Sequence, residues 1–126
     1  MSFSINRILS LPLLLIVTLI AGCDRSSVPP EPITLDQLPA ALDKAFTKAS
    51  SEAKAVSAQV VTALNAKDYQ QASAGLQKLS TLAGLNKEQA SVSARGVLTV
   101  NQALQEAQTK GDQKATQTLK SYRINK

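Results

Sequence analysis

The sequence predicts an all-α protein, arranged as an antiparallel helical hairpin or three-helix bundle with a short fourth helix near its C-terminal end. Three observations predict this fold class. Apolar residues recur every three or four positions from residue 35 onward, which is the period of an amphipathic helix. Residues typical of helix caps interrupt this period at intervals. The connections between the predicted helices are short, so consecutive helices are expected to fold back on one another.

Residues 1–22 have the plan of a cleaved export signal. A polar start carries Arg7 as its only charged side chain, and an apolar core follows over Ile8–Ile20. A positive start, an apolar core and small residues before the cut are typical of a signal peptide. As a helix this core would span about 20 Å, short of the hydrocarbon layer of about 30 Å. A cleaved signal is therefore predicted in preference to a permanent transmembrane helix.

The apolar core closes on Ile20-Ala21-Gly22-Cys23, an aliphatic residue, two small residues and the only cysteine. This sequence resembles the lipobox of bacterial lipoproteins. The resemblance implies that Cys23 receives a diacylglyceryl group, that signal peptidase II cuts before it, and that its freed amine is acylated. One acyl chain holds a protein on a membrane reversibly, whereas two or three hold it stably. We expect a lipid-anchored protein on the extracytoplasmic side of a bacterial membrane, with no cofactor besides these chains.

A short tether is predicted after the lipid attachment site. Asp24 follows the cysteine, and in lipoproteins of enterobacterial type an Asp at this place resembles the signal for retention in the inner membrane, so the inner membrane is preferred over the outer. Residues 23–33 include three prolines, which fix φ and remove backbone donors. They are expected to form an extended spacer of about 30 Å, at about 3.1 Å per residue.

The helical domain is expected over residues 34–126, and its first helix at about 36–65. This helix begins near Thr34 and Gln37, which have the spacing of a capping box, and near Pro39, which is tolerated in a first turn. Its apolar stripe continues in steps of three and four along Leu35, Leu38, Leu42, Phe46, Ala49, Ala53, Val56, Val60 and Leu64. The unbroken stripe predicts one long helix.

Three further helices are expected at about 68–83, 86–110 and 112–123, each beginning at a residue typical of an N-cap. These caps are Asp68, Asn86 and Asp112. The third helix is expected to turn inward Ala90, Ala94, Val97, Leu98, Leu104 and Ala107. The fourth helix is expected to turn inward Ala115, Leu119 and Tyr122. Two helix-interior glycines, Gly75 and Gly96, each cost about 1 kcal/mol there, and either close helix approach or a tolerant surface would explain them.

A second resemblance covers about a quarter of the chain. Lys67–Ala72, followed by Leu76 and Leu79, is similar to the start of the second helix of a tetratricopeptide motif. The resemblance implies tetratricopeptide-like packing of a helical hairpin. The sequence departs from the motif at Val56 and Val60, where the motif has a large aromatic residue and a glycine. No second copy follows, although a repeat array needs about three units to bury its core. A generic alanine-rich hairpin is the alternative.

The composition weighs against catalysis and against metal binding. The chain has no histidine, and its one cysteine is expected to carry lipid. The usual metal ligands, general bases and thiol nucleophiles are therefore missing. The acidic residues are scattered, mostly at predicted caps or exposed helix faces, and the sequence shows no pair placed in an apolar pocket. We expect no enzyme.

Charge is uneven along the chain. Residues 87–126 hold seven basic and three acidic side chains, whereas residues 24–86 hold six of each. A basic surface is attracted to anionic lipid head groups, and helix 112–123 is a candidate for lying on a membrane. A solvated face is the alternative. Nucleic acid is not an expected partner, because an exported protein is separated from the nucleic acid of the cell. The basic residues are also neither clustered nor interleaved with aromatic ones.

Two functions without catalysis remain. The first is a binding or scaffold module for an envelope protein or a second copy, because helices poor in large side chains often complete their burial against a partner. Its candidate surface, for which the intramolecular core is the alternative, comprises Val56, Val60, Leu64, Tyr69, Leu76 and Leu79. The second is a structural tether. Lys126, after Tyr122 and Arg123, is similar to the end of the major peptidoglycan-linked lipoprotein, whose terminal lysine amine is joined to the cell wall.

Overall fold

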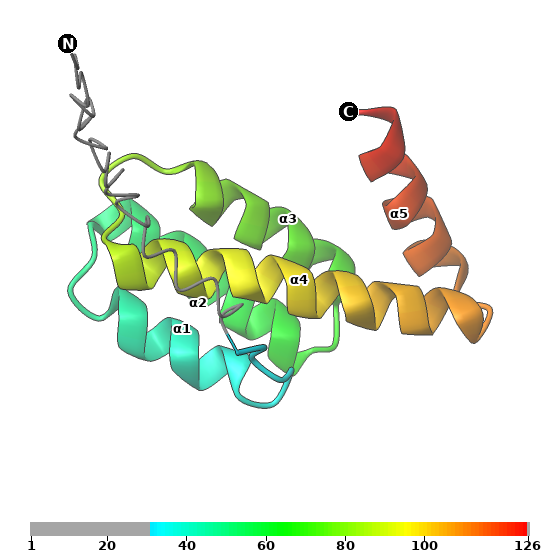
Figure 1. Ribbon diagram of the computed structural model, residues 1–126, viewed down its shortest axis with the longest axis horizontal. Helices are drawn as coiled ribbons and strands as arrows, with labels where there is room; N and C mark the ends of the chain where they lie inside the picture. Colours follow the sequence, from blue (N-terminus) through cyan, green and yellow to red (C-terminus); the bar gives the residue numbers. More distant parts are fainter. Residues whose placement is uncertain (1–30, 126) are drawn as a thin grey trace, which may run out of the picture.

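The computed structural model describes residues 31–125, and within this range the fold is all-helical with no strand (Figure 1). Its helices are α1 (Leu38–Phe46), α2 (Ser51–Asn65), α3 (Tyr69–Thr81), α4 (Lys87–Thr109) and α5 (Gln113–Ile124). The predicted all-α bundle is confirmed. The expected signal peptide, Cys23, Asp24 and Lys126 lie outside the described residues.

Helices α1 to α4 form a closed four-helix bundle, to which α5 is added. Within α1 to α4, consecutive helices run in opposite directions (Figure 1), and α1 packs against both α2 and α4, while α3 packs against the same two helices. The ring therefore closes between the first and fourth helices. Helix α4 is the longest, and α5 packs against α4 and touches α3. In the part of the chain that the structure describes, none of these helices is long and apolar enough to cross a bilayer.

The prediction of one helix at about 36–65 is wrong, because the chain turns between α1 and α2. The Ser50 hydroxyl accepts a hydrogen bond from the Ala53 N–H at 3.3 Å and caps α2. Glu52 lies in the first turn, where a negative charge favours a helix start. Both helices turn their apolar side chains to the same core, so the stripe continues although the axis does not. The bundle consequently has four helices instead of two or three.

The other predicted helix starts are confirmed at the level of single hydrogen bonds. The Asp68 carboxylate accepts from the Gln71 N–H at 3.1 Å. Asn86 and Gln89 form a reciprocal capping box, with bonds of 2.8 and 3.0 Å. The Asp112 carboxylate accepts from two N–H groups of the first turn of α5, at 2.8 and 3.2 Å. Each cap satisfies backbone donors that a helix leaves free at its start.

Close helix approach explains the two glycines in helix interiors. A Cβ built at Gly75 on α3 would lie 2.5 Å from Cγ2 of Val60 on α2. One built at Gly96 on α4 would lie 2.9 Å from Cδ2 of Leu76 on α3, and 3.1 Å from Cδ1 of Leu38 on α1. All three distances are shorter than ordinary van der Waals contact. The close-approach alternative is therefore confirmed, and surface tolerance is not.

The inward face predicted for the first half of α4 is wrong. Ala90 and Ala94 are exposed, and 69% of Leu98 is exposed. The buried face instead carries Gln89, Val92, Ser93 and Gly96, and Gly96 is where α1 and α3 leave no room for a larger side chain. Gln89, 5% exposed, donates from its amide nitrogen to the Ala45 carbonyl at 3.1 Å and so joins α4 to α1.

The segment before α1 is fixed to α4. Ile33 is buried in the core, and its carbonyl accepts a hydrogen bond from the Thr99 hydroxyl at 2.5 Å.

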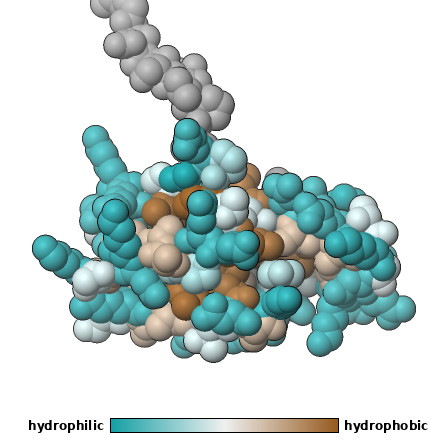
Figure 2. Space-filling view, turned by 90° about the horizontal axis from the view of Figure 1, so that it is seen from below, coloured by the Kyte–Doolittle hydropathy of each residue, from teal (hydrophilic) through white to brown (hydrophobic). Residues whose placement is uncertain are grey.

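The surface of the molecule mixes hydrophobic and hydrophilic side chains. Seen from below Figure 1, hydrophobic side chains reach the surface in patches between hydrophilic ones (Figure 2). The face in this view therefore does not present one continuous apolar area.

Candidate functional site

The predicted interaction surface lies almost entirely inside the core. Five of its six residues are at most 7% exposed and pack between the helices, namely Val56, Val60, Leu64, Leu76 and Leu79. They contact a partner only if the bundle opens. The expectation that these five form a surface is therefore wrong, and the alternative of an intramolecular core is confirmed. The sixth, Tyr69, is partly exposed.

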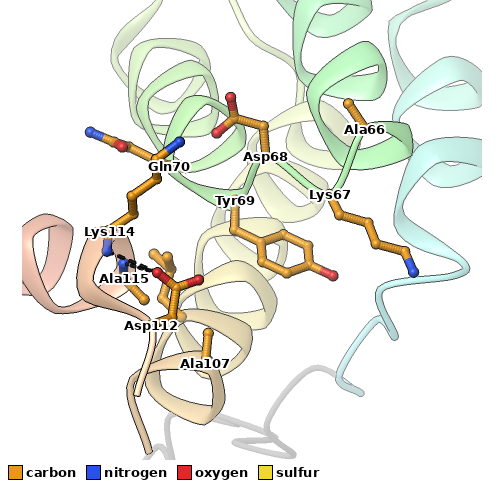
Figure 3. Close-up of a pocket in the computed structure, with 10 residues that line it drawn as sticks. Ala66, Lys67, Asp68, Tyr69, Gln70, Ala107, Asp112, Lys114 and Ala115 are labelled. Carbon is orange, nitrogen blue, oxygen red and sulfur yellow. Dashed lines mark hydrogen bonds between the residues drawn. The ribbon is translucent and has the colours of Figure 1, made fainter. Parts of the chain in front are cut away.

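Tyr69 lines a pocket of about 290 Å³ at which the N-terminal ends of α3 and α5 meet (Figure 3). Two helix N-termini attract anions through their free N–H groups. Here Asp68 already accepts from one of these groups and Asp112 from two, and both carboxylates place negative charge at the pocket. Lys67, in the turn before Tyr69, has a left-handed backbone with φ of 57°. We interpret this pocket as a junction of capped helix ends.

A larger groove lies between α4 and the C-terminal half of α5, with one edge on α3. Its volume is about 820 Å³, within the range of about 300–1,000 Å³ typical of ligand sites. Five of its lining side chains carry a primary amide: Gln77, Asn101, Gln105, Gln108 and Asn125. We call it the amide groove. Among its lining residues Arg123 alone is charged, and Val97, Leu119 and the Tyr122 ring supply apolar surface.

The position of α5 over this groove is fixed by Tyr122. Its hydroxyl donates to the Ser73 hydroxyl oxygen at 2.7 Å, and Ser73 is fully buried on α3. Ala115 is buried, and Leu119 and Tyr122 are partly buried against the core. The predicted inward face of the fourth helix is therefore confirmed. Because α5 is held at both its cap and its Tyr122, the groove is formed in the free protein.

Asn101 gives the amide groove an unmet hydrogen-bonding demand. Its Oδ1 atom is buried and has no hydrogen-bond partner. Leaving a buried polar atom unpaired costs about 1–3 kcal/mol, so such atoms are uncommon in folded proteins. Because the atom has no exposed surface, a ligand with an N–H or O–H group would remove that cost only after the Asn101 side chain rotates into the groove.

Arg95 provides the second such atom on α4. Its Nε atom is also buried without a partner. Arg95 lines a groove of about 400 Å³ between α4 and the segment before α1, whose other lining residues include Ile33, Leu35 and Leu98. This second groove is more apolar than the amide groove, and it lies where the chain leads toward the predicted tether.

The amide groove was not predicted from the sequence, although one signal for it exists. Asn101, Gln105 and Gln108 follow one another at spacings of four and three, which places three amides on one face of a helix. What the sequence does not show is that α5 packs against this face.

The lining groups of the amide groove are amides, hydroxyls, apolar side chains and one guanidinium. These groups form hydrogen bonds, and amides do so both as donors and as acceptors. Across residues 31–125 no three His, Cys, Asp or Glu side chains group where they could hold a metal ion. Comparison of the chain with protein-family models, curated proteins and solved structures found no match.

Proposed function

We propose that this chain is a lipid-anchored lipoprotein of the bacterial envelope whose helical domain binds a partner in the amide groove and catalyses no reaction. The observation that carries the binding role is the groove itself. It has the volume of a ligand site, its lining is almost uncharged, and its lining residues include Asn101, whose Oδ1 atom is buried without a hydrogen-bond partner.

The packing of α5 supports binding by a preformed site. Tyr122 is joined to the buried Ser73, and Asp112 caps the same helix, so both ends of the groove wall are held before a ligand arrives. A site that is already ordered loses less conformational entropy on binding. The groove therefore suits a partner that docks onto a fixed surface.

The lipid anchor is supported by the sequence Ile20-Ala21-Gly22-Cys23 after an apolar core. The intact mass of the protein, extracted from envelopes after muramidase digestion, tests it. We expect the mass of Cys23–Lys126 plus a diacylglyceryl group and one amide-linked acyl chain. Cys23→Ser should leave the signal uncut and add no lipid. A lipid-free wild-type mass would contradict the anchor, and an added muropeptide would favour the alternative tether through Lys126.

The binding role is tested by a photo-cross-linking residue placed in the full chain in cells. Gln105 and Gln102 are both exposed glutamines of α4, but only Gln105 lines the amide groove. We expect cross-linking to a discrete partner from position 105 and not from position 102. Equal products from both positions would show that the groove is not the binding surface.

A further inference from the structure

We infer that the amide groove takes a short extended peptide that carries a carboxylate group. This inference rests on the proposed function, since it names the ligand class of the same site.

The spacing of the amides favours an extended chain along α4. Asn101 and Gln105 are four residues apart on one helix face, hence about 6 Å apart along the axis at about 1.5 Å per residue. In an extended peptide, groups on one side repeat every two residues, or about 6.6 Å at about 3.3 Å per residue. A peptide lying along α4 therefore presents a backbone N–H or C=O to Asn101 and to Gln105 in turn, and Gln108 lies about 4.5 Å further along the axis.

The same chemistry disfavours a helical partner. A helix uses its N–H and C=O groups in its own hydrogen bonds, so it offers little backbone to the amides of the groove. Helix-in-groove recognition also depends on a hydrophobic groove, whereas most residues that line this one carry an amide or a hydroxyl beside the apolar surface of Val97 and Leu119. An extended peptide has free backbone donors and acceptors, which can pair with the exposed amide of Gln105 and, once its side chain rotates outward, with the amide of Asn101.

Arg123 supplies the preference for a carboxylate. It is exposed on α5 and is the one charged side chain lining the groove, which has no acidic residue to neutralise it. A guanidinium binds a carboxylate through two parallel hydrogen bonds. The carboxylate has two possible sources with the same chemistry, the C-terminus of the peptide or an Asp or Glu side chain. The apolar surface of Val97 and Leu119 leaves room for one apolar side chain of the peptide.

The test uses the full chain purified from membranes in detergent, and measures fluorescence anisotropy with pooled, N-terminally labelled tetrapeptides. One pool has free C-termini and no acidic residues, a second is C-terminally amidated, and a third is amidated but contains Asp or Glu. We expect the first or third pool to bind at least tenfold more tightly than the second, which identifies the source of the carboxylate.

Matched variants show whether binding occurs in the groove. Gln105→Leu and Arg123→Gln should each weaken binding at least tenfold. Gln102→Leu removes the same amide group from α4 and Lys120→Gln removes one positive charge from α5, both outside the groove, and binding should stay within twofold. Circular dichroism of each variant verifies that it is folded. Equal losses from the control variants would overturn the assignment.

Three other results would also overturn the inference. Equal binding of all pools would show that the groove does not require a carboxylate group on the peptide. A trimer of N-acetylglucosamine that binds with the same variant dependence, while peptides do not, would make the groove a glycan site. No peptide binding at millimolar concentration, together with a position-105 cross-link in cells, would reject the peptide class and leave the proposed function standing. If the cross-link is absent as well, both fail.

Discussion

The four-helix bundle and helix α5 come from the same alanine-rich chain, but they are stabilised differently. In the bundle, large side chains such as Leu38, Leu42, Leu76 and Leu79 are fully buried. In α5 the buried residues are Ala115 and Thr118, so it buries little apolar area. Apolar burial stabilises by about 25 cal/mol per Å². The bundle therefore supplies most of the stability, whereas α5 is held by specific polar contacts and forms one wall of the amide groove.

The largest difference should appear when one leucine is truncated in each region. Leu76→Ala removes a fully buried side chain from the bundle and should cost about 2–5 kcal/mol of unfolding free energy. Leu119→Ala removes a partly buried side chain from α5 and should cost less than about 1.5 kcal/mol. Urea unfolding of both variants checks this. Equal losses would show that α5 belongs to the same core as the bundle.

The close contact of α3 with α2 should give the next largest effect. Gly75→Ala places a Cβ against Val60 and should destabilise by about 1–3 kcal/mol. Combined with Val60→Ala, which opens space at that contact, it should cost less than the sum of the two single changes, with a coupling of about 0.5–3 kcal/mol.

Gly84→Ala is the control for this coupling. Gly84 has a φ of 79° and no atom near its Cβ position, so alanine there should cost about 1 kcal/mol through the backbone alone. It should show no coupling to Val60→Ala. Strict additivity of Gly75→Ala with Val60→Ala would mean that α2 and α3 move apart to make room for the new Cβ, and that the Cβ does not clash with Val60 alone.

Local signals allowed much of this fold to be predicted. A cap depends on a few neighbouring residues, so Asp68, Asn86 and Asp112 identified three helix starts correctly. The turn before Ser50 was missed for the opposite reason. The spacing of apolar residues shows which side chains are buried, but it does not show whether the helix axis continues, and Ser50 with Glu52 was the only local sign of a new start.

The candidate site could not be predicted because it depends on tertiary packing. The buried face of α4 holds Gln89 and Gly96 where α1 and α3 approach, and no hydropathy pattern selects such residues over the exposed Leu98. The amide groove depends on the direction in which α5 leaves α4. That direction is fixed by the contact of Tyr122 with Ser73, which lies 49 residues earlier in the chain.

A smaller effect is expected from the polar contact that holds α5. Tyr122→Phe leaves the buried Ser73 hydroxyl without its donor and should cost about 1–1.5 kcal/mol. Hydrogen exchange should speed up in α5 and change little in α2 and α3. Adding Ser73→Ala should recover most of the loss, because replacing both partners leaves no unpaired group. Faster exchange throughout the bundle would contradict a separate, locally held α5.

The smallest effect concerns the two turns that precede α3 and α5. Both place a residue in the left-handed region, but the bundle turn uses Lys67, with φ of 57°, and the α5 turn uses Gly111, with φ of 89°. A left-handed non-glycine residue costs about 1–2 kcal/mol, and glycine loses about 0.5–1 kcal/mol more entropy on folding. Lys67→Gly should therefore stabilise by up to about 1 kcal/mol, and Gly111→Ala should destabilise α5 by a similar amount.

Lys67→Ala removes the ammonium group but keeps the backbone cost, so its unfolding midpoint in urea should stay near that of the wild type. If Lys67→Gly lowers that midpoint instead, the lysine side chain stabilises the pocket beside Tyr69 by more than its backbone costs.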